Sequence, residues 1–126
     1  MQNGQDNLPE IIDKAGDFLI DQDDLEHAEI LYAAAAEVHP KVAIYHIGLG
    51  YCAGANGRFD DAVKHTRRAV ELEPDNYRHL SDLGFSLTQA GQYDEAEQIL
   101  LRAAKLAPPD YEMAKGNLDH LYDVWD

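Results

Sequence analysis

The chain has little that would anchor it in a membrane or a disulfide framework. Cys52 is the only cysteine among 126 residues, so no internal disulfide can form and the fold cannot depend on an oxidising environment. The longest apolar run, residues 30–36, is far shorter than the roughly 20 residues that cross a bilayer. Residues 1–8 lack the basic start and the apolar run of a secretory signal. We therefore expect a cytoplasmic protein without membrane insertion.

Positive charge is also scarce. The chain has 10 Lys and Arg residues against 24 Asp and Glu residues, which gives a net charge of −14. Such a surface repels phosphate backbones, so we expect no nucleic-acid partner. Acidity can simply keep a small protein soluble. However, residues 9–42 hold nine carboxylates and two lysines, which predicts that one end of the molecule is acidic.

Sequence patterns of catalytic and metal sites are missing as well. There is no GxGxxG motif, P-loop or nucleophile elbow. No two of the six histidines have the i, i+4 spacing that puts two metal ligands on one helix face. We therefore expect no enzyme activity, no metal and no cofactor. Cys52 is interpreted as a small buried apolar residue rather than a reactive thiol.

What the chain does have is a regular repeat. Pro40, Pro74 and Pro108 stand 34 residues apart. Further columns at the same spacing are Gly16, Gly50 and Gly84; Ala28, Ala62 and Ala96; and Ala35, Ala69 and Ala103. A fixed period of this length predicts a stack of helix–turn–helix hairpins. The small residues are expected where two helix axes approach closely, because a larger side chain would hold the axes apart.

Residues 77–110 show the pattern of one unit. Its first helix is predicted by residues at helical spacing, namely Leu80, Leu83, Gly84 and Leu87. Gly91 is expected to end this helix in a left-handed conformation, which glycine adopts without steric cost. Asp94 and Glu97 have the spacing of a capping box, which predicts the start of the second helix. Pro108 and Pro109 end that helix.

These columns resemble the pattern of the tetratricopeptide repeat (TPR) family. The third unit matches it with Gly84, Gly91, Tyr93, Ala96, Ala103 and Pro108. The resemblance covers residues 9–110 and divides them into units at 9–42, 43–76 and 77–110. It implies a single all-α domain, a right-handed α-solenoid of three hairpins. Asp23 replaces the turn glycine of the first unit, which aspartate tolerates at some cost.

Two segments flank the three units. Residues 1–8 are expected to form a flexible N-terminus. Residues 111–126 are expected to add a seventh helix, because Ala114, Leu118, Leu121 and Trp125 form an apolar stripe. A terminal helix with a polar outer face is what an open-ended stack needs to cover its last hairpin.

The resemblance also implies a concave face, lined mainly by the first helix of each hairpin. The residues expected to line a partner-binding groove there are Asp13, Asp17, Ile44, Ile47, Tyr51, Arg78, Asp82 and Phe85. This groove begins acidic and turns apolar, and Gly48, Gly54 and Ala55 are expected to leave room in it for an inserted side chain. The alternative that Tyr51 and Phe85 only pack between repeats remains open.

One known use of such a groove does not fit this chain. TPR co-chaperones that bind the acidic tails of heat-shock chaperones carry lysine, arginine and asparagine at five groove positions. Those positions here hold Asp13, Asp17, Gly48, Arg78 and Asp82. Only Arg78 is of the required kind, so we do not expect this chain to bind acidic tails in that way.

We expect a non-enzymatic adaptor or small chaperone whose partner is another protein. The groove would bind a peptide segment or amphipathic helix with apolar anchors and a basic flank. One alternative is a TPR-type chaperone of type III secretion subunits, because residues 48–62 resemble the central repeat of those proteins. Another alternative is a self-associating structural scaffold. The expected oligomeric state is a monomer or a weak homodimer.

Overall fold

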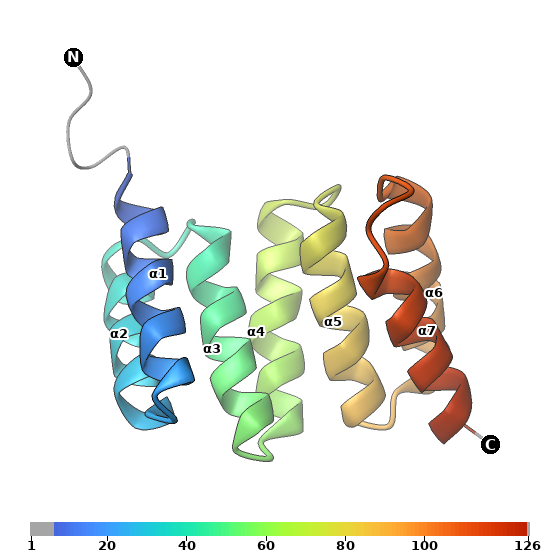
Figure 1. Ribbon diagram of the computed structural model, residues 1–126, viewed down its shortest axis with the longest axis horizontal. Helices are drawn as coiled ribbons and strands as arrows, with labels where there is room; N and C mark the ends of the chain where they lie inside the picture. Colours follow the sequence, from blue (N-terminus) through green and yellow to red (C-terminus); the bar gives the residue numbers. More distant parts are fainter. Residues whose placement is uncertain (1–6, 126) are drawn as a thin grey trace.

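The computed structural model describes residues 7–125, which form seven α-helices and no strand. In chain order the helices are α1 (Leu8–Asp21), α2 (Leu25–Val38), α3 (Ala43–Ala55), α4 (Phe59–Leu72), α5 (Tyr77–Gln89), α6 (Tyr93–Leu106) and α7 (Met113–Val124). They form three hairpins, α1–α2, α3–α4 and α5–α6, followed by α7 (Figure 1). The predicted all-α solenoid with a seventh helix is confirmed. Of the segment expected to be flexible, residues 1–6 lie outside the described residues, and α1 already begins at Leu8.

The first helices of the hairpins form one continuous layer. Helix α1 contacts α3, α3 contacts α5, and α5 contacts α7. Each second helix packs on the first helix of its own hairpin and on the next first helix along the chain. Helices α1 and α7 therefore lie at opposite ends of the molecule (Figure 1). On the face of the first helices that no second helix covers, side chains form a row along the length of the molecule.

Each hairpin turns through one residue with a left-handed backbone. These residues are Asp23, Gly57 and Gly91, with φ angles of 60°, 78° and 79°. The two glycines adopt this conformation without steric cost, whereas Asp23 does so with a Cβ atom in place. The structure thus confirms the predicted equivalence of Asp23 with the two turn glycines.

Replacing Gly91 with alanine should lower the free energy of unfolding by about 1–2 kcal/mol, because a Cβ atom is strained at positive φ. No neighbouring atom would meet that Cβ, so the effect isolates backbone strain. The matched control is Gly116→Ala in α7, where the added Cβ also meets nothing and the backbone is helical. That change should instead raise stability by about 0.5–1 kcal/mol. Urea unfolding of both variants checks the prediction, and a loss in both would contradict it.

Glycines in α1 and α3 make room for one buried ring. Tyr32 of α2 is almost fully buried, and a Cβ atom at either Gly16 or Gly48 would overlap its ring. Gly84 faces Leu100 in the same way in the third hairpin. The prediction that small residues mark close approaches is therefore confirmed. The prediction that Gly48 leaves room for a partner is wrong, since Tyr32 fills that space from inside the fold.

Helix α7 covers the last hairpin. Ala114 and Leu121 are buried, and Leu118 and Trp125 pack partly buried against the same core. The hydroxyl of Tyr122 donates a hydrogen bond of 2.7 Å to the Glu97 carboxylate of α6. These contacts confirm the predicted role of the seventh helix.

The start of α6 differs from its prediction. The helix begins at Tyr93 and has no hydrogen bond from a capping side chain. The predicted capping box of Asp94 and Glu97 is wrong because Asp94 already lies in the first turn. The Tyr93 ring instead packs against Trp125, with ring centres 5.9 Å apart. The start of α6 thus contacts the residue that directly follows α7.

Candidate functional site

All eight residues predicted to line the groove surround two adjoining hollows along the first helices. The acidic hollow, of about 420 Å³, crosses α1, α3 and α5 and includes Asp13, Asp17, Ile44, Ile47, Tyr51, Arg78 and Asp82. The apolar hollow, of about 360 Å³, lies between α3 and α5 and includes Ile47, Tyr51, Asp82 and Phe85. Because Ile47, Tyr51 and Asp82 border both hollows, the two are continuous. We call this combined surface the groove.

Two accessible aromatic side chains wall the apolar hollow. Tyr51 is 54% exposed and Phe85 is 39% exposed, so packing between repeats leaves much of both rings open to solvent. Gly54 and Ala55 line the same hollow and add almost no side-chain bulk. Ile47 lies one helical turn before Tyr51 and extends the apolar wall. The hollow can therefore accept a large apolar side chain from outside.

The acidic hollow holds three carboxylates from two helices. Tyr32 donates a hydrogen bond from its hydroxyl to Oδ1 of Asp13 at 2.9 Å, which orients that carboxylate. Partial burial raises the pKa of Asp13, the bond from Tyr32 opposes the shift, and the nearby charge of Asp17 adds to it. Within residues 7–125 no ion pair neutralises Asp13, Asp17 or Asp82. The hollow is thus acidic, with Arg78 as the one Lys or Arg side chain among the described residues that line it.

Asp82 lies where the two hollows meet. Its side chain reaches solvent, yet protein atoms surround it on several sides because the surface there is concave. These surroundings raise the pKa of Asp82 to about 6, although the positive charge of Arg78 favours the ionised form. Because Asp82 is exposed, water screens this effect, so we expect the ionised carboxylate to lower the stability of the fold only modestly at neutral pH.

Replacing Asp82 with asparagine should raise the melting temperature by a few degrees at pH 7.5 and change it little at pH 4. The folded-state pKa of Asp82 lies above the ordinary value of 3.8, so its ionisation destabilises the fold as pH rises from about 4 to 6. Asparagine cannot ionise, so the variant gains stability over that same range. Asp119→Asn, on the exposed face of α7, is the matched control and should show no such pH-dependent gain. Thermal unfolding across this pH range checks the prediction, and an Asp82→Asn gain largest at pH 4 would contradict it.

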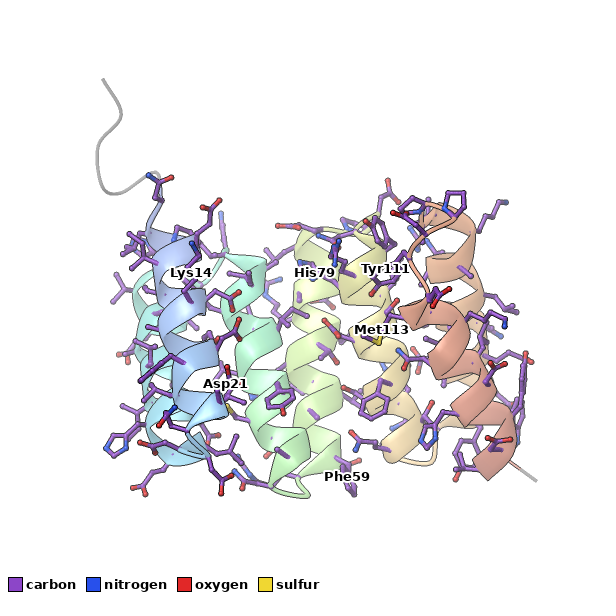
Figure 2. All side chains as sticks on the ribbon, in the orientation of Figure 1. Lys14, Asp21, Phe59, His79, Tyr111 and Met113 are labelled. Atoms are coloured by element: carbon purple, nitrogen blue, oxygen red, sulfur yellow. The ribbon has the colours of Figure 1, made fainter. Side chains whose placement is uncertain are left out.

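Aromatic rings hold Arg78 at the edge of the groove. Its guanidinium carbon lies 5.5 Å from the ring centre of Tyr77 and 5.2 Å from that of Tyr111. His79, the next residue, is buried, and its Nε2 lies 3.3 Å from the Glu73 carboxylate. Burial lowers the pKa of His79, against the opposing effect of Glu73. Figure 2 shows His79 and Tyr111 near the start of α5.

The groove prediction missed several residues that the structure adds. Those lining the hollows are Tyr32, Gly50, Thr66, His79 and Ser86. Tyr32 and Thr66 come from second helices, which the prediction did not consider. Each reaches the groove past a glycine of a first helix, since a Cβ atom at Gly48 would meet Tyr32 and one at Gly50 would meet Thr66. The column of Gly16, Gly50 and Gly84 was the signal that could have identified both, because Gly16 also faces Tyr32.

Two other kinds of site have no candidate in the part of the chain that the structure describes. No group of three or more His, Cys, Asp or Glu side chains stands close enough to hold a metal ion. None of the described helices is both long and apolar enough to cross a membrane. Cys52 is buried, as interpreted from the sequence, and burial raises the pKa of its thiol to about 11.

Two tetratricopeptide repeat family models match the sequence, one over residues 53–118 and the other over residues 14–64. The first alone spans more than half of the chain. The chain belongs to the tetratricopeptide repeat family. TPR proteins bind other proteins and are typically non-enzymatic interaction modules. No curated protein matches the sequence significantly.

Solved structures share the TPR fold of this chain. An O-GlcNAc transferase mutant from Thermobaculum terrenum matches with a TM-score of 0.85 and 22% identity, over 100% of this chain but only 25% of that one. The Sgt2 TPR domain from Aspergillus fumigatus matches with a TM-score of 0.82 and 17% identity, over 91% of this chain and 77% of that one. The Yersinia enterocolitica type III secretion translocator chaperone SycD matches with a TM-score of 0.81 and 21% identity, over 97% of this chain and 86% of that one. At these identities the likeness concerns the fold alone.

Proposed function

We propose that this TPR domain is an adaptor or small chaperone that binds a segment of another protein in its groove. The segment is a peptide or amphipathic helix with a large apolar anchor next to basic residues. The observation that carries the proposal is the continuity of the two hollows, which puts accessible aromatic surface beside carboxylates that lack a cationic partner. A cytoplasmic location fits the unpaired, buried thiol of Cys52.

The apolar anchor would enter between Tyr51 and Phe85. Burying these half-exposed rings removes apolar surface from water, at roughly 25 cal/mol per Å². Gly54 and Ala55 leave space beside the rings for a branched or aromatic side chain. The apolar hollow therefore supplies most of the affinity in this proposal.

The carboxylates would select the charge of the segment. A lysine or arginine next to the anchor would meet Asp82 first, because Asp82 borders both hollows, and then Asp17 along the groove. Charge-assisted hydrogen bonds to these groups favour a basic flank and disfavour an acidic one. Arg78 is the one cation lining the acidic hollow, and it is stacked on tyrosine rings at the edge.

Fluorescence anisotropy with three labelled peptides of equal length tests this function. The first has leucine anchors one turn apart and a lysine–arginine flank, the second replaces the basic residues with glutamate, and the third replaces the anchors with alanine. We expect the first to bind at least about tenfold more tightly than either of the others. Equal affinity for the first two would contradict charge selection, and equal affinity for the first and third would contradict the apolar anchor.

A second candidate is a chaperone of secretion subunits. It is favoured by the fold shared with the Yersinia translocator chaperone over most of both chains. The resemblance of residues 48–62 to the central repeat of such chaperones points the same way. Co-expression with an aggregation-prone amphipathic subunit distinguishes the two candidates. A chaperone of this kind keeps the subunit in solution, whereas a general adaptor leaves it aggregated.

A further inference from the structure

The outer side of α1 carries an apolar stripe that no described residue covers. Ile11, Ala15 and Phe18 follow the i, i+4, i+7 spacing of one helix face. Ile11 is 55% exposed and Phe18 is 62% exposed. Helix α1 packs on α2 through a different face, which includes Ile12 and Leu19. Helix α1 stands at the end of the row of hairpins (Figure 1), and none of the three stripe residues lines the groove.

The repeat shows what kind of surface this is. One repeat later, the residues equivalent to Ile11 and Phe18 are Tyr45 and Cys52 of α3, both 0% exposed. Two repeats later they are His79 and Ser86 of α5, which are 8% and 5% exposed. Helices α3 and α5 bury these positions because each packs on the preceding hairpin. The stripe on α1 thus occupies repeat positions that α3 and α5 bury between hairpins. On α1 these positions are exposed and hold two large apolar side chains, Ile11 and Phe18.

We propose that a second copy of this chain covers the stripe, in a two-fold dimer whose α1 helices pack antiparallel. The stripe has a large residue at each end and a small one between, so its order is the same in both directions. In an antiparallel pair Ile11 therefore meets Phe18 of the second copy, and Ala15 lets the two helices approach closely. A patch that complements itself in this way is the requirement of a two-fold interface.

The other end of the molecule argues against head-to-tail stacking. The outer face of α7 carries three exposed charged residues, Lys115, Asp119 and Asp123, beside the half-exposed ring of Tyr122, whose hydroxyl is bonded to Glu97. The stripe of one copy would have to bury against these charges, which is unfavourable. Pairing of two stripes also closes the assembly at two copies, whereas head-to-tail contacts would continue into a filament.

Charge makes the dimer weak and dependent on salt. One flank of the stripe is charged and consists of Glu10, Lys14, Asp17 and Asp21. Figure 2 shows Lys14 and Asp21 on α1. A two-fold axis brings this flank of both copies together. Each Lys14 then lies near carboxylates of the second copy, but three carboxylates per copy outnumber it. Salt screens the remaining repulsion without weakening the apolar contact. Dimerisation is therefore stronger at high ionic strength.

Sedimentation velocity tests the dimer without any knowledge of the partner bound in the groove. The wild-type chain, from about 10 µM to about 1 mM, should shift towards a dimer with concentration, and more so at about 500 mM than at about 50 mM NaCl. Phe18→Asp should remain monomeric throughout. The control Leu101→Asp alters a side chain that is 51% exposed on α6, and it should behave as wild type. A wild type that stays monomeric at the highest concentration and salt overturns the proposal, as does a Phe18→Asp variant that dimerises like wild type.

A cysteine cross-link tests the pairing itself and does not depend on how well Phe18→Asp folds. Ala15→Cys should form a disulfide-linked dimer under mild oxidation, because the two copies of this residue meet near the axis, within the short reach of a disulfide. Buried Cys52 leaves a low background. The control Lys115→Cys, on α7, should cross-link much more slowly. Equal cross-linking rates for the two variants, or no cross-linking of Ala15→Cys, would overturn the antiparallel arrangement.

Discussion

Replacing Tyr32 with alanine should lower the free energy of unfolding by about 3–5 kcal/mol, the range for removing a buried aromatic ring. The ring is only 1% exposed and fills the space beside Gly16 on α1 and Gly48 on α3. Both of these neighbours are glycines, so neither has a side chain that could move in to fill the cavity. The loss therefore falls on the contact between the first and second hairpins. Because repeats in a solenoid are stabilised by their neighbours, the first hairpin should become the least stable part of the domain.

Urea unfolding and native-state hydrogen exchange check this prediction. Tyr32→Phe is the matched control, since it keeps the ring and removes only the hydroxyl bonded to Asp13; it should cost about 1 kcal/mol. In Tyr32→Ala, amide protection should fall most in α1 and α2. A loss no larger than that of Tyr32→Phe, or a loss of protection centred on α6 and α7, would contradict the proposed packing role.

The double substitution Ile47→Asp with Tyr51→Asp should weaken binding of the anchored basic peptide by about a hundredfold or more. Both residues border the two hollows and stand one turn apart on α3. Each change removes apolar contact area and puts a charge where the anchor would be buried, and central aromatic contacts of this kind contribute about 2 kcal/mol or more each. Because Tyr51 is already 54% exposed, we expect the fold to tolerate its change.

The matched control is Leu101→Asp with Leu106→Asp, which adds two charges to exposed apolar positions on α6, outside the groove. Anisotropy with the same peptide should give wild-type affinity for this control. Circular dichroism should give the same helix content for both double variants. Weakened binding in both would point to a general effect of charge, and unchanged binding in the Ile47/Tyr51 variant would place the peptide elsewhere on the surface.

Local sequence signals predicted the fold because each helix boundary has a local cause. Gly57, Gly91 and Asp23 occupy the left-handed turn positions, as their shared place in the repeat predicted. The capping box at Asp94 failed because α6 already begins at Tyr93, so Asp94 lies in its first turn. The contact of Tyr93 with Trp125 could not be predicted locally, because the two residues are distant in the sequence.

The candidate site was predicted in outline only. The eight groove residues do meet along the first helices, because a constant repeat places equivalent positions on the same face. Whether they bind a partner stays a prediction. The reasoning assigned Gly48 to the groove as empty space, whereas Tyr32 occupies that space. Thr66, which reaches the groove from a second helix past Gly50, was missed because only first helices were expected to line the groove.

The sequence by itself determined the three hairpins, through the 34-residue period, and the seventh helix, through its apolar stripe, because both follow from turns and helical spacing within short segments. The tertiary structure alone decided which side chain fills each gap between hairpins and which carboxylate lies in a concave part of the surface. The raised pKa of Asp82 and the exposed stripe at Ile11 and Phe18 are of this second kind. Both depend on which atoms the neighbouring hairpins place around a residue. Residues at equivalent repeat positions can have completely different surroundings.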